Sequence, residues 1–112
     1  MKRYLISFDD GWMTFPEADL PAVEVATRRV VREAKDAGVW IFGGGLQTQS
    51  ASIVATDGTV TAGPDPETKS VIGGFSIIEV PSREEALEWA ARIAAACRCT
   101  QEVREIMYDP ES

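Results

Sequence analysis

Two adjacent carboxylates near the start of the chain, Asp9 and Asp10, are the first residues whose surroundings could support chemistry. They are followed closely by three large apolar side chains, Trp12, Met13 and Phe15. Apolar neighbours favour the protonated form of a carboxyl group, which equips it for general acid–base catalysis near neutral pH. Asp9 is therefore a candidate catalytic residue, and Trp12 and Phe15 are candidate contacts for a small apolar or aromatic ligand. The alternative is that residues 9–11 form a turn and the apolar side chains seal the core or a dimer interface.

A second candidate site is a polar loop that contains Asp65, Glu67, Thr68 and Lys69. Glu67 could serve as a general base, and Lys69 could bind a substrate anion or a developing oxyanion. Asp65 and Thr68 would be further ligand contacts. The alternative is that these side chains satisfy backbone groups of the turn while Lys69 is solvated. Tyr4 is a candidate ligand contact through its hydroxyl, although a packed tyrosine is the commoner case on a strand.

The chain contains no histidine, and its two cysteines are Cys97 and Cys99. Cysteines this close in sequence rarely form a disulfide, because the Cα geometry is unfavourable. Two thiols are also too few for a structural zinc site. We therefore expect two reduced thiols, no metal and no other cofactor.

The composition predicts a single acidic domain over residues 1–112. A hydrophobic share of 45% allows a core without metal or disulfide support. The net charge of −7 argues against a nucleic-acid partner, whose phosphates require a concentrated basic surface. No run of apolar residues is long enough to span a membrane, and the apolar stretch after Met1 is too short for a signal peptide. A cytoplasmic location is expected.

The residues after Asp19, a candidate N-cap, have the pattern of an amphipathic helix that ends at Gly38. Apolar side chains recur three or four residues apart at Val23, Ala26, Val30, Ala34 and Ala37. Glu24 and Arg28 are four residues apart, and we expect this pair on the solvent side.

A second helix follows Ser82, which forms a capping-box pattern with Glu85. Its expected buried face consists of Ala86, Trp89, Ala90, Ile93 and Cys97.

The remaining segments favour strands at residues 3–8, 39–42, 52–56, 59–62, 72–80 and 102–107. Asp57-Gly58 predicts a two-residue type I′ turn between the third and fourth of these. The glycines at 43–45 are expected to break or bulge the second strand; they do not form a phosphate loop, because neither Lys-Ser nor Lys-Thr follows them.

Without the 52–62 hairpin, the order of elements is βαββαβ, the ferredoxin-like arrangement of an α+β protein. Both helices then cover one face of an antiparallel sheet. Strands as apolar as residues 39–42 and 75–80 cannot leave the other face in water, so a second copy of the sheet is the expected cover and the protein is expected to be a homodimer.

The segment 63–69, Gly-Pro-Asp-Pro-Glu-Thr-Lys, followed by Gly73-Gly74-Phe75, resembles the signature of the YCII-related proteins, in the branch named for a DGPF tetrapeptide. Those chains read D-G-P-F-x-E-T-K with a Gly-Gly-Phe a few residues later. Further similar segments are residues 37–39, 44–46, 85–93 and 102–104. Two positions depart from the pattern: Ala62 replaces the Asp of the tetrapeptide and Asp65 replaces its Phe.

The resemblance implies a dimeric α+β barrel and little about activity, since most members have no assigned reaction. Related YCII proteins include a dehydrochlorinase with a suspected His–Asp catalytic unit, which this chain cannot form because it has no histidine. Some DGPF relatives are encoded beside alternative sigma factors or joined to them, which implies a regulatory role for part of the family.

These observations predict a homodimeric α+β barrel that binds a small organic ligand in a pocket between sheet and loops. One alternative is a lyase- or hydrolase-type enzyme that uses Asp9 or Glu67 with Lys69. Another is a regulatory protein-interaction module linked to transcription. A cavity lined by convergent polar groups would favour the binder or the enzyme, and a filled barrel with an exposed apolar patch would favour the interaction module.

Overall fold

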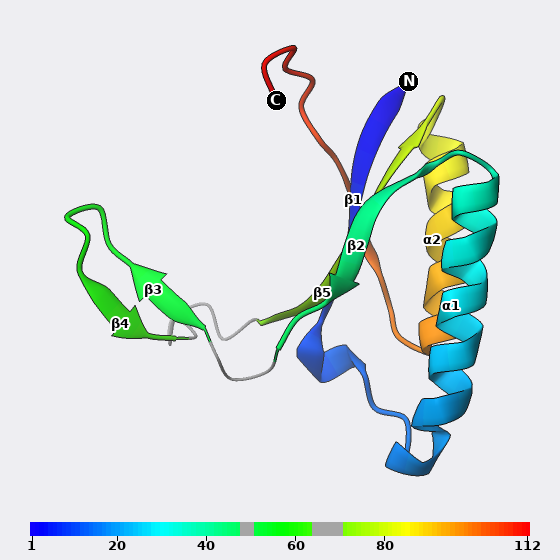
Figure 1. The fold of residues 1–112 in the computed structure, drawn as a ribbon, viewed down its shortest axis with the longest axis horizontal. Helices are drawn as coiled ribbons and strands as arrows, with labels where there is room; N and C mark the ends of the chain where they lie inside the picture. Colours follow the sequence, from blue (N-terminus) through cyan, green and yellow to red (C-terminus); the bar gives the residue numbers. More distant parts are fainter. Residues whose placement is uncertain (48–50, 64–70) are drawn as a thin grey trace.

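A computed structural model describes residues 1–47, 51–63 and 71–112. Two α-helices lie along one face of a four-stranded sheet, and a separate two-stranded hairpin stands on the side away from the helices (Figure 1). The strands are β1 (Lys2–Asp9), β2 (Trp40–Gly45), β3 (Ser52–Val54), β4 (Val60–Ala62), β5 (Ile72–Val80) and β6 (Glu102–Glu105). The helices are α1 (Leu20–Asp36) and α2 (Arg83–Cys97), with 3-10 turns at Asp10–Trp12 and Glu17–Asp19.

The main sheet has the strand order β2-β5-β1-β6, and all neighbouring pairs are antiparallel. Each helix connects two strands that are not adjacent in the sheet, and β1 and β5 lie at its centre. This is the βαββαβ order of the ferredoxin-like fold, and the α+β prediction is confirmed.

The core lies between the sheet and the helices because side chains alternate along the central strands. Tyr4, Ile6, Ile78 and Val80 are fully buried beneath α2. The intervening residues, among them Leu5 and Ile77, point to the opposite face of the sheet. Buried residues of α2 complete the core as the sequence predicts, with Ala86, Ala90, Ile93 and Cys97 buried and Trp89 packed against them.

The termini of the helices follow their predicted signals, with one exception. The Ser82 hydroxyl accepts a hydrogen bond from Glu85 N at 3.3 Å and caps α2. Gly38 takes a φ of 75° just beyond α1, a left-handed conformation that glycine adopts without strain. Asp19 precedes α1 as expected, but its side chain does not cap the helix. It accepts a hydrogen bond from Arg98 instead.

The buried stripe of α1 is narrower than the sequence predicts. Val23 and Ala34 are buried, Ala26 and Val30 are half-buried, and Ala37 is exposed beyond the end of the helix. The spacing of apolar residues correctly predicted a helix. It did not predict which of these residues the sheet and α2 would bury.

The glycine run extends β2 rather than ending it, contrary to the prediction. Gly43, Gly44 and Gly45 pair with Ser76, Phe75 and Gly74 of β5. The irregularity lies earlier, at Ile41, where Trp40 pairs with Ile78 and Phe42 with Ile77. The bulge leaves Ile41 without a partner in the register.

The β3–β4 hairpin forms where predicted, but its turn is not type I′. A type I′ turn needs a positive φ at both central residues, and Asp57 does not have one. Ala55 N donates to Thr59 O, Gly58 N donates to Ala55 O, and Gly58 alone takes a positive φ, of 90°. The connection is a three-residue loop with glycine at its left-handed position. The Asp57 carboxylate holds it by accepting from Thr59 N at 2.9 Å, and this hydrogen bond lowers the Asp57 pKa.

The last strand is shorter than predicted, since β6 ends at Glu105 and Ile106 makes one further backbone bond, to Arg3 O. In the part of the chain that the structure describes, no helix has the length and apolar character needed to cross a membrane.

Candidate functional site

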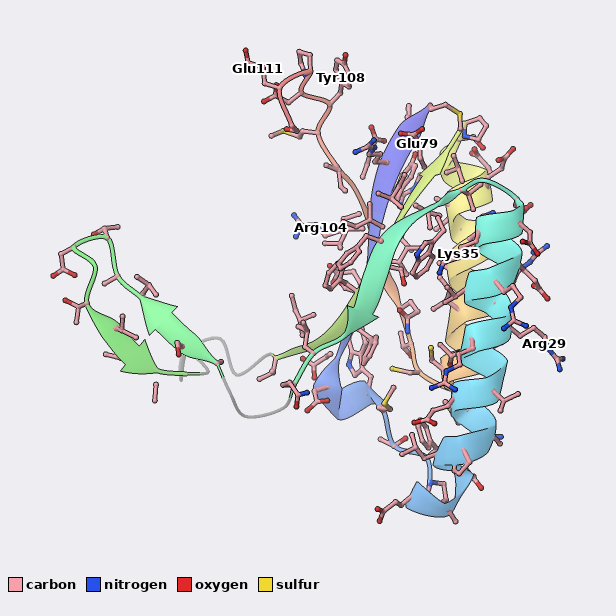
Figure 2. All side chains as sticks on the ribbon, in the orientation of Figure 1. Arg29, Lys35, Glu79, Arg104, Tyr108 and Glu111 are labelled. Atoms are coloured by element: carbon pink, nitrogen blue, oxygen red, sulfur yellow. The ribbon has the colours of Figure 1, made fainter. Side chains whose placement is uncertain are left out.

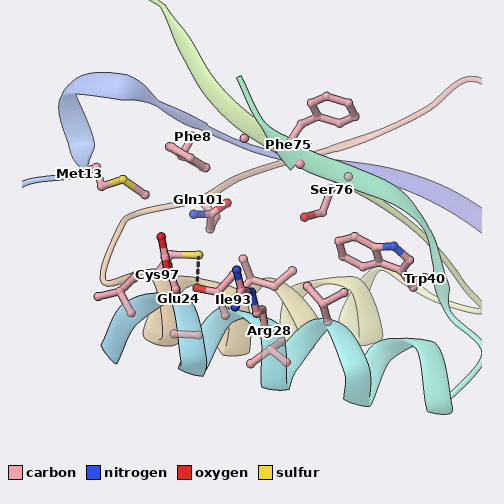
Figure 3. Close-up of a pocket in the computed structure, with 18 of the residues that line it drawn as sticks. Phe8, Met13, Glu24, Arg28, Trp40, Phe75, Ser76, Ile93, Cys97 and Gln101 are labelled. Atoms are coloured by element: carbon pink, nitrogen blue, oxygen red, sulfur yellow. Dashed lines mark hydrogen bonds between the residues drawn. The ribbon is translucent and has the colours of Figure 1, made fainter. Parts of the chain in front are cut away.

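A cavity of about 540 Å³ lies between α1 and the helix-facing side of the sheet (Figure 3). A volume of this size suits a small organic molecule. Most of its surface is apolar, and the large apolar side chains around it are Phe8, Met13, Phe15, Leu20, Val31, Trp40 and Ile93. In Figure 3, Met13 lies at one end and Trp40 at the other, with Arg28 between them on α1.

The glycine run of β2 helps to form this cavity. Gly43 has no room for a side chain, because an added Cβ would lie 2.6 Å from Phe75 O and 2.9 Å from the Trp40 ring. Gly44 and Gly45 have open space where a Cβ would stand. Three residues of strand therefore border the cavity without a side chain to fill it.

Neutral polar groups converge on the floor of the cavity. The Thr27 hydroxyl lies 3.6 Å from the Cys97 thiol, across the contact between the two helices. Ser76 points into the cavity from β5 (Figure 3). Gln101 lies between helix and sheet, and its Nε2 donates to Cys99 O at 3.2 Å, which fixes the position of the amide.

The two thiols near this floor are free and buried. Burial raises the pKa of Cys97, while the Thr27 hydroxyl acts in the opposite direction. Burial also raises the pKa of Cys99, and the neighbouring Cys97 and Asp9 add to this. Both thiols are therefore protonated at neutral pH, which makes them poor nucleophiles and poor metal ligands.

Charged side chains of α1 form part of the cavity wall. The lining includes Glu24, Arg28 and Lys35. Glu24 and Arg28 are exposed, as the sequence predicts, and they also border the cavity. Within the described residues, these two side chains do not form an ion pair, although their spacing of four residues would permit one.

Of the predicted ligand contacts Tyr4, Trp12 and Phe15, only Phe15 lines the cavity. Phe15 is half-buried and lines the cavity. Tyr4 is fully buried in the core, where its hydroxyl donates to Glu105 Oε1 at 3.4 Å, and it does not line the cavity. Trp12 is 42% exposed and also lies outside the lining.

Asp9 connects two chain segments at the end of the sheet. Its Oδ1 accepts from Gly11 N at 2.8 Å and its Oδ2 from Val71 N at 3.2 Å. The carboxylate caps the 3-10 turn and holds the start of β5 against the end of β1, and it does not line the cavity. These contacts favour the interpretation of residues 9–11 as a turn.

The other predicted site residues, Asp65, Glu67, Thr68 and Lys69, lie outside the described residues. Within the ranges that the structure describes, no three Cys, Asp or Glu side chains are grouped to hold a metal ion.

Sequence reasoning missed Thr27, Ser76 and Gln101 as cavity residues, although a signal for two of them was present. Thr27 interrupts the apolar stripe of α1, and Ser76 occupies an inward position of β5 between Gly74 and Ile78. A polar residue at a position where the period predicts an apolar one indicates a solvent-filled or ligand-filled space.

The fold and the cavity define an α+β protein with a ferredoxin-like sheet and a cleft between sheet and helix. The sequence model of the YCII-related domain family matches residues 17–108 of the chain. The chain therefore belongs to this family. The matched range contains both helices and every strand except β1. No curated protein matches the chain.

Proposed function

We propose that this YCII-related protein binds a small organic molecule in the cleft between α1 and the sheet. The observation that carries the proposal is a cavity of about 540 Å³ with an apolar lining and a few convergent polar side chains. Specific small-molecule sites have this composition, because apolar contacts supply affinity and a few polar groups fix orientation. The atoms that line an empty apolar cavity lack dispersion contacts on one side, and a bound ligand would supply them.

The test fills the cleft and measures binding of a flat aromatic probe. Val31 lines the cavity from α1, and Val25 of the same helix is 60% exposed and lies outside it. We expect 2-naphthamide to bind the wild type in calorimetry, Val31→Trp to abolish binding, and Val25→Trp to leave it unchanged. Ser76→Leu should also abolish binding, and it provides a second test if Val31→Trp folds poorly. Unchanged binding to both filled variants would place the ligand elsewhere.

We further propose that the protein is a homodimer joined through the sheet face that the helices leave open. Phe42 and Phe75 lie on this face with ring centroids 5.9 Å apart, together with Leu5 and Ile77. Ile41 and Ile106 line a shallow pocket with Ile77 on the same face. Phe42 is 62% exposed and Ile41 is 42% exposed in the single chain. Arg3, Glu79 and Arg104 lie on the same face, beside the apolar residues. An exposed apolar patch bordered by charged residues is typical of a subunit interface. The β3–β4 hairpin, which exposes Val54 and Val60, stands on the same side (Figure 1).

Light scattering coupled to gel filtration tests the assembly. The wild type should have twice the chain mass of 12.2 kDa at micromolar concentration. Phe42→Glu should shift the protein to the monomer, because it places a charge in the proposed interface. Val25→Glu, on the outer face of α1, should remain dimeric. A monomeric wild type would contradict the proposal.

A further inference from the structure

Two cations of α1 lie at the cleft, although the protein as a whole is acidic. Arg28 and Lys35 both belong to the cavity lining, against one carboxylate, Glu24. The chain carries 18 Asp and Glu residues and only 11 Lys and Arg. The balance of charge in the lining is thus opposite to that of the molecule, and it raises the local concentration of an anion at the cleft.

Neither cation has a carboxylate partner in residues 1–47, 51–63 and 71–112. In these ranges Lys2, Arg3 and Arg98 form ion pairs, whereas Arg28, Lys35 and the neighbouring Arg29 do not. Arg28 and Lys35 therefore keep their hydrogen-bond donors available for a ligand.

The direction of the side chains supports the same conclusion. Lys35 extends from α1 toward the sheet, whereas Arg29 extends from the same helix away from it (Figure 2). Arg28 rises from α1 into the space beneath the sheet (Figure 3). Residues 28 and 35 are seven positions apart, so their backbones are about 10 Å apart along one face of the helix.

We propose that the ligand of the cleft is an organic acid, with an anionic group bound by Arg28 and Lys35 and an aromatic or aliphatic body against the apolar wall. This inference rests on the proposed small-molecule function and specifies the class of ligand. The guanidinium of Arg28 presents a planar fork that matches a carboxylate, while the Lys35 ammonium contributes a more mobile charge. Phe8 and Trp40 offer the apolar contact for the ligand body. Ser76 and Gln101 supply neutral polar groups to the lining.

The experiment compares two probes of nearly equal shape that differ in charge, 2-naphthoate and the neutral 2-naphthamide. We expect the wild type to bind the carboxylate about ten-fold or more tightly than the amide, because a charge-assisted hydrogen bond distinguishes them. Arg28→Gln should remove most of this preference and Lys35→Gln should reduce it. Arg29→Gln provides the matched control, since it deletes the adjacent cation outside the cleft, and it should bind both probes like the wild type. The preference should also decline with added salt.

Each outcome decides between the two proposals. Equal binding of both probes by the wild type, or an unchanged preference in Arg28→Gln, overturns the organic-acid assignment and leaves the cleft as a binding site. Loss of the preference in Arg29→Gln to the same extent also overturns it, because the effect would then reflect only net charge. If neither probe binds the wild type, the cleft function itself fails and the assignment fails with it.

Discussion

Arg98 Nη1 lies 2.9 Å from Asp19 Oδ2, and this contact connects the end of α2 to the residue that precedes α1. Arg98 takes a φ of 53°, and within the described part of the chain it is the one residue other than glycine with a positive φ. Its N–H donates to Ala94 O and completes the C-terminal cap of α2. A left-handed conformation is costly for a residue with a Cβ, so this position combines an ion pair with backbone strain.

Arg98→Gly and Arg98→Ala separate these two contributions. Both variants lose the ion pair, which is half-exposed and contributes little. Only glycine adopts the left-handed conformation without strain, so we expect Arg98→Gly to be more stable than Arg98→Ala by about 1 kcal/mol. Urea denaturation measures the difference. Equal stability of the two variants would show that the backbone at this position is not strained.

Gly43 and Gly44 provide a matched pair for testing close packing in β2. A Cβ at Gly43 would lie 2.6 Å from Phe75 O, a backbone atom that cannot move without shifting β5. We expect Gly43→Ala to lower the free energy of unfolding by about 1–3 kcal/mol. Gly44→Ala meets no atom within 4 Å and should be neutral or slightly stabilising. Thermal and urea unfolding measure the stability of both variants. An equal loss of stability in Gly43→Ala and Gly44→Ala would contradict the expected difference.

Asp9 and Asp10 should differ in their contribution to stability, although they are adjacent. Asp9→Ala removes the acceptor for Gly11 N and Val71 N, and we expect a loss of about 1–2 kcal/mol. Asp10 is exposed, so Asp10→Ala should change stability by less than about 0.5 kcal/mol. Binding of 2-naphthamide should persist in both variants, because neither residue lines the cleft. If Asp10→Ala lost as much stability as Asp9→Ala, the structural role assigned to Asp9 would be contradicted.

The buried thiol of Cys97 predicts a decline in stability at alkaline pH. Burial raises its pKa above the ordinary value of 9.0, so the unfolded chain loses this proton at a lower pH than the folded protein. The unfolded state then binds fewer protons, and the free energy of unfolding falls as the pH rises beyond 9. Below that pH the contribution is fully present.

Urea denaturation between pH 7.5 and 10 tests this expectation. Cys97→Ala should show a shallower decline than the wild type, because it removes the thiol that titrates differently in the two states. Parallel curves for the wild type and the variant would contradict the expectation. Cys97 also raises the pKa of Cys99, so the difference between the curves reports the Cys97 thiol together with its effect on Cys99.

Much of the architecture follows from local sequence signals. The cap at Ser82, the glycine at 38 and the alternation of β1 and β5 predict elements that the structure contains, because these signals act within a few residues of chain. The order of the elements then leaves the ferredoxin-like sheet as the arrangement in which both helices cover one face. The turn at Asp57 and Gly58 was predicted with the wrong type, because the loop includes a third residue that the dipeptide does not reveal.

The candidate site depends on packing that the sequence does not encode locally. The prediction treated Glu24 and Arg28 as a solvent-facing pair, since charged residues at that spacing usually stabilise an exposed helix surface. Both side chains are exposed as predicted. Because α1 packs along α2 and leaves a cavity against the sheet, they also border a cleft that the sequence did not predict. Tyr4, predicted to reach a ligand, lies instead in the core beneath α2.

The sequence by itself determined most of the elements and their order, because period, caps and turns depend on neighbouring residues. Only the tertiary structure decided which side chains border the cleft. Thr27 of α1 contacts Cys97 of α2 beside the cleft, and residues 43–45 of β2 border it without side chains. These residues are far apart in the chain, so the sequence pattern around any one of them does not show that they border the same cleft.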